Sequence, residues 1–195
     1  MNTTSPLDLD YVRSQFPGLA RGWTLFDNAG GSQILKGAVE RINTFLIEKN
    51  VQIGGSYAVS QAAAAALYES RTAAMNLVNA SRPEEIVFGA STTQLLQNLA
   101  RAMQSQLSPG DEIIVTVSDH ESNIGPWDRL QERGITLKFW PLNKDTLTLD
   151  LADLAPLMSD RTKMVCVTHV SNILGSINPI RAIADFVHAR GAKIC

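Results

Sequence analysis

The sequence predicts an α/β fold: an α-β-α sandwich with a mostly parallel sheet. From residue 83 onward, short apolar runs alternate with longer segments of helical period, which is the pattern of βαβ units. The turn residues agree with this pattern, because Ser-Pro-Gly-Asp at 108–111 and the glycines at 134 and 191 stand where helices should end. With 45% hydrophobic and 18% charged residues in 195, the composition is that of an ordinary globular domain.

The part of the chain before residue 83 is predicted to be mainly helical. Alanines at 62–66 strengthen one of its helices, because alanine is the strongest helix former. We expect an N-terminal arm with a short helix over 1–25, and an incomplete large domain over 26–195. The expected elements are a short N-terminal helix, a strand-like segment at 24–27, a helix near 34–49, a glycine-containing loop at 51–57 and a helix at 58–79.

Strands and helices are expected to alternate through the rest of the chain, by the period of their apolar residues. The last residues, Ala-Lys-Ile-Cys at 192–195, begin what the pattern indicates is a central strand. A parallel strand is normally followed by more structure, so the domain is expected to be cut short. The expected strands are 84–89, 111–117, 135–142, 162–170 and the one beginning at 192; the expected helices are 91–107, 123–134, 147–159 and 178–191.

Charge and composition argue against several classes of protein. The net charge is −2, from 17 basic and 19 acidic residues without a basic cluster, so no nucleic-acid partner is expected. The first residues lack the pattern of a secretory signal, and no apolar run is long enough to cross a bilayer, so a cytoplasmic protein without a membrane partner is expected. Two cysteines make neither a disulfide framework nor a zinc knuckle.

Polar residues follow three of the predicted strands, where ligands bind in open α/β sheets. Ser91, Thr92 and Thr93 open a predicted helix with hydroxyl groups and free backbone N–H groups, which suits a phosphate. The plainer interpretation is that Ser91 is only an N-cap. A nucleoside triphosphate or a dinucleotide is disfavoured, because neither a Walker lysine motif nor a G-x-G-x-x-G segment is present.

His120 follows the predicted strand 111–117, in the segment Asp-His-Glu-Ser-Asn. Its ring should lie over the carboxyl edge of the sheet, where it would serve in acid-base chemistry, in ring stacking or only in a turn. A metal site is disfavoured, because the other histidines, His169 and His188, lack metal-ligand spacing to it. His188 is expected to be an exposed helix residue, and His169 structural.

Two further places leave alternatives open. Asn172 follows the predicted strand 162–170, where its amide forms a turn or reaches a ligand hydroxyl. Asn28 and the adjacent glycines Gly30 and Gly31 form either an ordinary tight turn or a close backbone approach to a ligand. Cys166 lies inside an apolar run and is interpreted as structural, because a nucleophilic thiol needs exposure and a nearby base.

Several motifs occur in the order of one known family over nearly the whole chain. They are FDNAGGSQ, ASTTQ, SDHESNIGPW, PLN, LDLADL and THVSNILGSINPI. In these motifs the chain resembles the class V aminotransferase family of fold-type I pyridoxal-phosphate enzymes, and within it the cysteine desulfurase-like branch. The resemblance implies pyridoxal 5'-phosphate as cofactor, a small amino acid such as cysteine as substrate, and a homodimer.

The resemblance also implies roles for individual residues. Thr93, with Thr92 beside it, would hold the cofactor phosphate. His120 would stack on the pyridine ring and help to move protons, as a catalytic residue, and Asn172 would reach the ring oxygen or the substrate carboxylate. Asn28, Ala29 and Gly30 would line the substrate side, and the loop at Gly54 and Gly55 would lie near the partner subunit's site.

The same resemblance places two essential groups after Ile194: the aspartate that pairs with the pyridinium nitrogen and the lysine that forms the Schiff base. Lys193 is no substitute, because it precedes a strand at the opposite edge of the sheet. The chain alone is therefore expected to be an inactive portion of an enzyme that cleaves the C–S bond of an amino acid. An amino-acid C–S lyase, an epimerase, an aminotransferase and a non-catalytic binding or dimerisation module are the alternatives.

Overall fold

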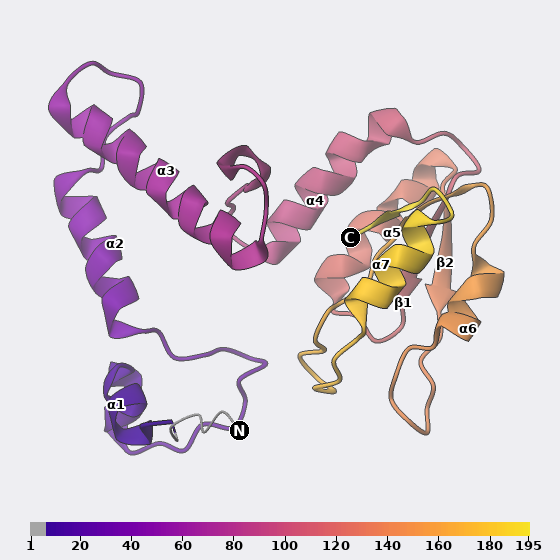
Figure 1. Cartoon of the computed structure of the whole chain (residues 1–195), viewed down its shortest axis with the longest axis horizontal. Helices are drawn as coiled ribbons and strands as arrows, with labels where there is room; N and C mark the ends of the chain where they lie inside the picture. The colour runs from indigo at the N-terminus through magenta and orange to yellow at the C-terminus, as the bar shows by residue number, and fades with distance from the viewer. Residues whose placement is uncertain (1–6) are drawn as a thin grey trace, which may run out of the picture. The chain divides into compact units, whose positions relative to one another are not determined.

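The computed structural model describes residues 7–195 and forms two compact units, Met1–Val87 and Phe88–Cys195. The described part of the first unit contains helices only, and the second unit contains the described strands (Figure 1). The second unit has the predicted α/β architecture. The division predicted after residue 25 stays a prediction. Among the residues described, no helix combines the length and hydropathy that a bilayer crossing requires.

Three α-helices make up most of the first unit: α1 (Leu9–Ser14), α2 (Lys36–Glu48) and α3 (Ala58–Val78). They confirm the helices predicted in this part of the chain. The α3 helix ends at Asn79, whose left-handed backbone (φ 55°) lets its N–H bond to the carbonyl of Met75. The alanine-rich sequence therefore continues as a helix until a residue that tolerates positive φ.

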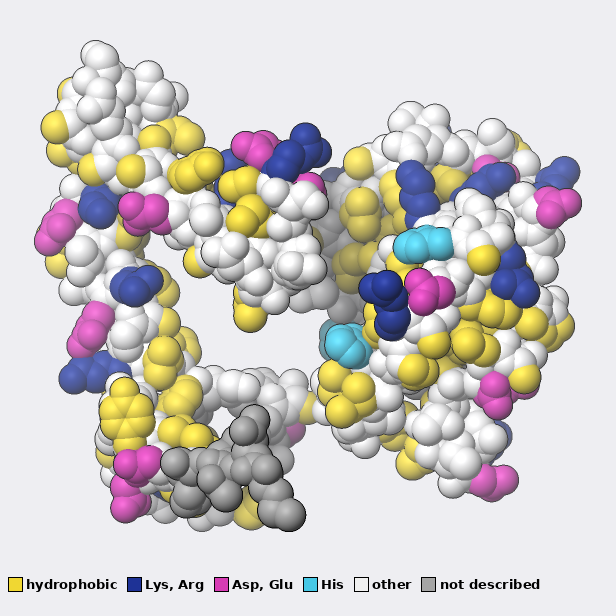
Figure 2. Space-filling model, viewed as in Figure 1, with side chains coloured by type: hydrophobic (Ala, Val, Ile, Leu, Met, Phe, Trp, Pro, Cys, Tyr) yellow, Lys and Arg dark blue, Asp and Glu magenta, His cyan; other side chains and the backbone are white. Residues whose placement is uncertain are grey.

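Few side chains of the first unit are buried. Ser60 and Ala63 are the buried residues of α3, and no residue of α1 or α2 is buried. Ser60 fixes the loop before α3, because its hydroxyl accepts from the N–H of Gly55 at 2.9 Å and donates to the carbonyl of Gln52 at 2.8 Å. Figure 2 shows hydrophobic side chains exposed along α2 and α3.

Four parallel strands form the sheet of the second unit, in the spatial order β2-β1-β3-β4. Their residues are mainly β-branched, aromatic or aliphatic, which suits a sheet covered on both faces. The central strands β1 and β3 are the most buried. The strands are β1 (Glu112–Thr116), β2 (Thr136–Trp140), β3 (Thr162–Val165) and β4 (Lys193–Ile194).

Helices cover both faces of this sheet. The predicted helices at 91–107 and 178–191 are confirmed as α4 (Thr92–Met103) and α7 (Ile180–His188). Those predicted at 123–134 and 147–159 each hold one short α-helix that continues as a 3-10 helix. These short helices are α5 (Gly125–Asp128) and α6 (Leu151–Leu154).

Two apolar cores separate the sheet from its helices, because successive side chains of a strand point to opposite faces. On one face Ile113 and Val115 pack with α4 and with Trp127 of α5. On the other face Ile114 packs with Leu154 of α6 and with α7. The sheet is therefore the middle layer of an α-β-α sandwich.

Two expectations about strands are wrong. Residues 24–27 and 84–89 are not paired in a sheet, and Phe26 and Phe88 are 92% and 52% exposed. The backbone of Ile86 is extended, as its residue type favours, but extended backbone becomes a strand only beside a partner strand. The strand β4 lies at the edge of the described sheet, and its expected central position stays a prediction.

Candidate functional site

The strand order reverses between β1 and β3. The chain moves from β1 outward to β2 and then returns to place β3 on the other side of β1. Such a reversal separates the connections that leave the two strands, and ligands of open α/β sheets bind in the crevice at their carboxyl ends. His120 follows β1 and Asn172 follows β3, so both predicted residues belong to the two loops at this switch point.

The N-terminus of α4 offers free hydrogen-bond donors. The Ser91 hydroxyl caps the helix by accepting from the N–H of Gln94 at 3.2 Å, and the Ser91 carbonyl accepts from Leu95 at 3.0 Å. Within the described chain, no protein group accepts from the N–H of Thr92 or Thr93, and both residues are exposed. These N–H groups, the two hydroxyls and the helix dipole suit a phosphate dianion.

Removal of the Ser91 cap gives a direct test of this local geometry. We expect Ser91→Ala to lower the free energy of unfolding by about 1 kcal/mol, because the N–H of Gln94 loses its acceptor. Ser105→Ala is a matched control at an exposed serine whose hydroxyl contacts only the carbonyl of Ala102, and it should change stability by less than about 0.5 kcal/mol. Urea unfolding measures both, and equal effects would contradict the capping role.

His120 is exposed and begins a short 3-10 turn, Glu121–Asn123. Its Nδ1 accepts from the backbone N–H of Ser122 at 3.1 Å and lies 2.9 Å from the Ser122 hydroxyl. Because an N–H donates to Nδ1, the neutral ring carries its proton on Nε2. The turn thus binds the imidazole through Nδ1, and Nε2 makes no hydrogen bond within the turn. The α4 helix packs against this turn.

Asp119 was not predicted as a site residue, yet its carboxylate holds this region together. Its Oδ2 accepts from the hydroxyl of Thr116 at 3.3 Å, from Nδ2 of Asn123 at 3.0 Å and from the backbone N–H of Thr168 at 3.1 Å. Burial raises the pKa of the Asp119 carboxyl, against these hydrogen bonds, which lower it. The sequence shows that Asp119 is next to His120, but it does not show that the carboxylate of Asp119 accepts from Thr168, which follows β3.

Asn172 lies in the exposed part of the loop after β3. The base of that loop is fixed by Asn178, which is 4% exposed and donates through Nδ2 to the carbonyl of Thr168 at 2.8 Å. Ser171 tightens the tip, because its hydroxyl accepts from the N–H of Leu174 at 3.1 Å. The loop is thus rigid at its base and presents the amide of Asn172 at the surface.

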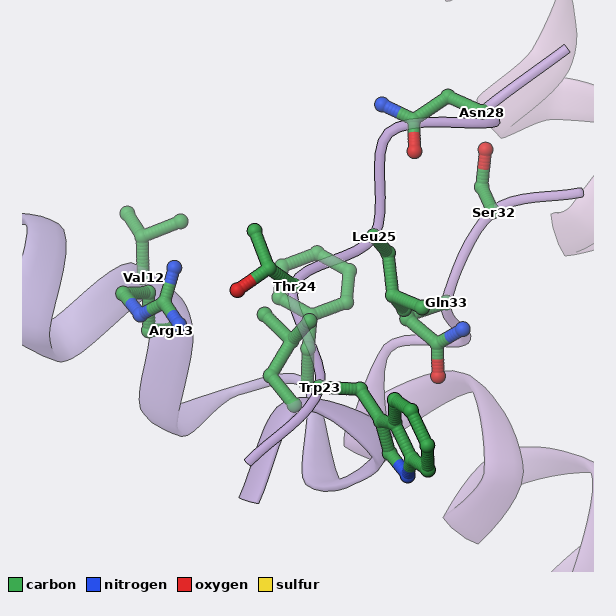
Figure 3. A pocket seen from close by; sticks show the side chains of 10 residues that line it. Val12, Arg13, Trp23, Thr24, Leu25, Asn28, Ser32 and Gln33 are labelled. Atoms are coloured by element: carbon green, nitrogen blue, oxygen red, sulfur yellow. The ribbon is translucent and has the colours of Figure 1, made fainter. Parts of the chain in front are cut away.

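Asn28, Ala29 and Gly30 form a tight turn in the first unit. The N–H of Gly30 donates to the carbonyl of Asp27 at 3.1 Å, and the N–H of Gly31 to that of Asn28 at 3.3 Å. Asn28 lines a cavity of about 350 Å³, together with Trp23, Ser32 and Gln33 (Figure 3). The predicted substrate-side turn therefore borders a cavity of its own unit.

Two other groups can be assigned structural positions. Burial and the adjacent Cys195 thiol raise the pKa of Cys166 well above that of a free thiol, and Cys166 is fully buried, as expected of a structural cysteine. Lys193 donates to Oε1 of Gln106 at 3.1 Å, and Gln106 precedes β1. Lys193 thus lies at the amino edge of the sheet, opposite His120.

Among the described residues, no cluster of three or more His, Cys, Asp or Glu side chains could hold a metal.

Known proteins share this arrangement. A family model for class V aminotransferases matches residues 24–195. The aminotransferase-like protein FGM3 of Gibberella zeae is 45% identical over 192 residues, which cover 95% of this chain and 47% of FGM3. A cysteine desulfurase of Dickeya dadantii is 33% identical, over 95% of this chain and 47% of that protein. The apo structure of a cysteine desulfurase from Thermococcus onnurineus NA1 matches with a TM-score of 0.86 and 30% identity, over 95% of this chain and 46% of that one.

The match to this desulfurase structure, together with the parallel sheet between two helical layers, assigns the chain to the fold-type I class. More particularly, the chain belongs to the class V aminotransferase family, as its motifs indicated. It spans about half the length of the curated relatives it matches.

Proposed function

We propose that this chain supplies the phosphate-binding and ring-binding part of a pyridoxal 5'-phosphate enzyme that cleaves the C–S bond of cysteine or a related amino acid. The observation that carries the proposal is the pairing of two features: α4 begins with free N–H groups at Thr92 and Thr93, and it packs against the turn that presents His120. A phosphorylated aromatic ring needs an anion site and a stacking surface, and this unit has a candidate for each.

In this proposal Thr92 and Thr93 bind the phosphate, His120 stacks on the ring and Asn172 hydrogen-bonds the ring oxygen or the substrate carboxylate. Pyridoxal phosphate, when bound, supplies the electron sink for bonds at the substrate's α carbon. Nε2 of His120 is the atom at which this chain would hold or release a proton. Asn28, Ala29 and Gly30 line the substrate side.

We further propose a homodimer in which the Gly54–Gly55 loop lies near the partner's site. The exposed apolar side chains of α2 support an association of this kind, since Ile42, Leu46 and Ile47 are each more than half exposed. The chain alone is proposed to bind cofactor without turning over cysteine, because the resemblance places the Schiff-base lysine after Ile194. Sulfide release by the purified chain would contradict that proposal.

Cofactor titration of the purified chain tests the proposed site. We expect Thr93→Val to weaken pyridoxal phosphate binding by about 10-fold, the effect of one hydrogen bond to a charged group. His120→Ala should weaken it by about 3- to 10-fold through lost stacking. Equilibrium dialysis measures both, and Thr136→Val, an exposed threonine that begins β2, is the matched control.

The result is decisive in either direction. Wild-type chain that does not bind pyridoxal phosphate, or His120 and Thr93 variants that bind it as wild type does, would refute the assignment. Relatives carry both desulfurase and aminotransferase-like names, so the substrate assay should follow sulfide and oxo acid together. Oxo acid without sulfide would favour the aminotransferase alternative.

A further inference from the structure

We propose that Asp119 is a positioning residue, which holds the His120 turn in place by tying it to the loop after β3 across the switch point. This inference rests on the proposed function, because the position of His120 matters only if its ring meets a ligand. Asp119 itself is not proposed to touch the cofactor or the substrate.

The contacts of His120 alone cannot fix its turn relative to β3. Both hydrogen bonds of its Nδ1 go to Ser122, two residues along the chain, so they move together with the turn. Between residues 117–123 and 166–178, both fully described, the only hydrogen bond is from the N–H of Thr168 to Oδ2 of Asp119, at 3.1 Å. This bond joins residues 49 positions apart.

The same carboxylate oxygen also secures both ends of its own segment. It accepts from Thr116, the last residue of β1, and from Asn123, the last residue of the 3-10 turn. His120 lies between these two donors in the sequence. One acceptor therefore fixes the segment at its start, at its end and against the neighbouring strand, which is what holding an exposed ring requires.

The loop after β3, which donates the Thr168 N–H to Asp119, is also held by hydrogen bonds at its base. The carbonyl of Thr168 accepts from Nδ2 of the buried Asn178 at 2.8 Å, and the carbonyl of His169 accepts from the N–H of Asn178 at 2.8 Å. The segment that carries Asn172 leaves from this base. Asp119 thus links the two loops that carry the proposed ring contacts, and loss of its carboxylate should loosen the turn while the sheet stays intact.

Three variants separate this role from an ordinary stabilising one. Asp119→Ala removes the acceptor, and Asp119→Asn keeps an oxygen of the same shape without the charge. Asp128→Ala is the matched control, because Asp128 is an exposed aspartate of the same unit whose Oδ1 accepts only from Gln131. We expect hydrogen exchange at the Thr168 N–H to be about 10-fold faster in Asp119→Ala and about 2- to 3-fold faster in Asp119→Asn.

Exchange at Val115, inside β1, should stay unchanged in both variants. The nitrogen NMR signals of the His120 ring should show the Nε2–H form in wild type and move toward a mixture of tautomers in Asp119→Ala. Pyridoxal phosphate binding should weaken by about 10-fold in Asp119→Ala and by no more than about 3-fold in Asp119→Asn. Asp128→Ala should match wild type throughout.

The inference is overturned if Thr168 exchange and the His120 signals of Asp119→Ala equal those of wild type, or if Thr168 and Val115 exchange faster by the same factor. It is also overturned if the turn loosens while cofactor affinity is unchanged. Should Asp119→Ala fail to fold, wild-type exchange at Thr168 in Asp119→Asn would overturn it. A wild-type chain that binds no cofactor refutes the proposed function instead, and the exchange and ring signals still decide whether Asp119 holds the turn.

Discussion

Replacement of Trp127 by alanine is expected to lower the free energy of unfolding by about 3–5 kcal/mol. The indole is fully buried in the core between α4 and the sheet, against Ile113 and Val115 of β1. Alanine would leave a cavity in a unit whose total stability is only about 5–15 kcal/mol, so much of the chain should be unfolded at moderate urea. The midpoint of urea unfolding, followed by circular dichroism, measures this loss.

Trp23→Ala is the matched control, because this indole is 73% exposed and its loss should change stability by less than about 0.5 kcal/mol. Trp127→Phe should recover more than half of the loss, since it refills most of the cavity. Trp127 also anchors the His120 segment, with Nε1 pointing to Oδ1 of Asn123 at 3.5 Å. A small effect of Trp127→Ala would mean that α5 does not hold this segment on the core.

Features set by local sequence could be predicted. The helix α4 follows from its apolar period and its Ser91 cap, and Gly134 and Gly191 end helices with φ of 82° and 75°, as their positions indicated. The polar residues after β1 and β3 could also be located, because the end of a strand is visible in the chain. These predictions depend only on residues that are close together in the sequence.

Features that depend on distant residues could not be predicted in the same way. Residues 86–89 have strand-forming side chains, but no described strand pairs with them. The edge position of β4 follows from the order of pairing, which no local pattern contains. The role of Asp119 could not be predicted, because its partner, the N–H of Thr168, is 49 positions away. The strand ends that carry the candidate site residues were therefore accessible from the sequence, whereas the hydrogen bond that links the two loops was not.

Glu112 is the second position where a large effect is expected, at the amino edge of the sheet. Its Oε2 accepts from Nζ of Lys138 at 2.7 Å, from the hydroxyl of Ser159 at 2.7 Å and from that of Thr162 at 3.1 Å. The carboxylate side chain is only 13% exposed. We expect Glu112→Ala to cost about 2–4 kcal/mol, because it leaves a partly buried ammonium group without its counter-charge.

The pH dependence of stability should identify the charge as the cause. Desolvation raises the pKa of Glu112, but the bonds from Lys138, Ser159 and Thr162 outweigh it, so the pKa in the folded chain lies below its ordinary value. The stabilisation is therefore complete above the pKa of the unfolded chain, about 4.3, and is lost as the pH falls through the lower folded value. Glu112→Gln keeps the shape of the side chain and removes this titration.

Urea unfolding of wild type and Glu112→Gln between neutral pH and about pH 3 tests the sign. The wild-type advantage should be constant above about pH 5 and shrink steadily below about pH 4, because protonation makes Glu112 as neutral as glutamine. Glu132→Gln, at an exposed glutamate in the same unit, should track wild type over the whole range. If the advantage of wild type over Glu112→Gln survived unchanged at pH 3, the negative charge of Glu112 would not be its cause, and the charge assignment would be wrong.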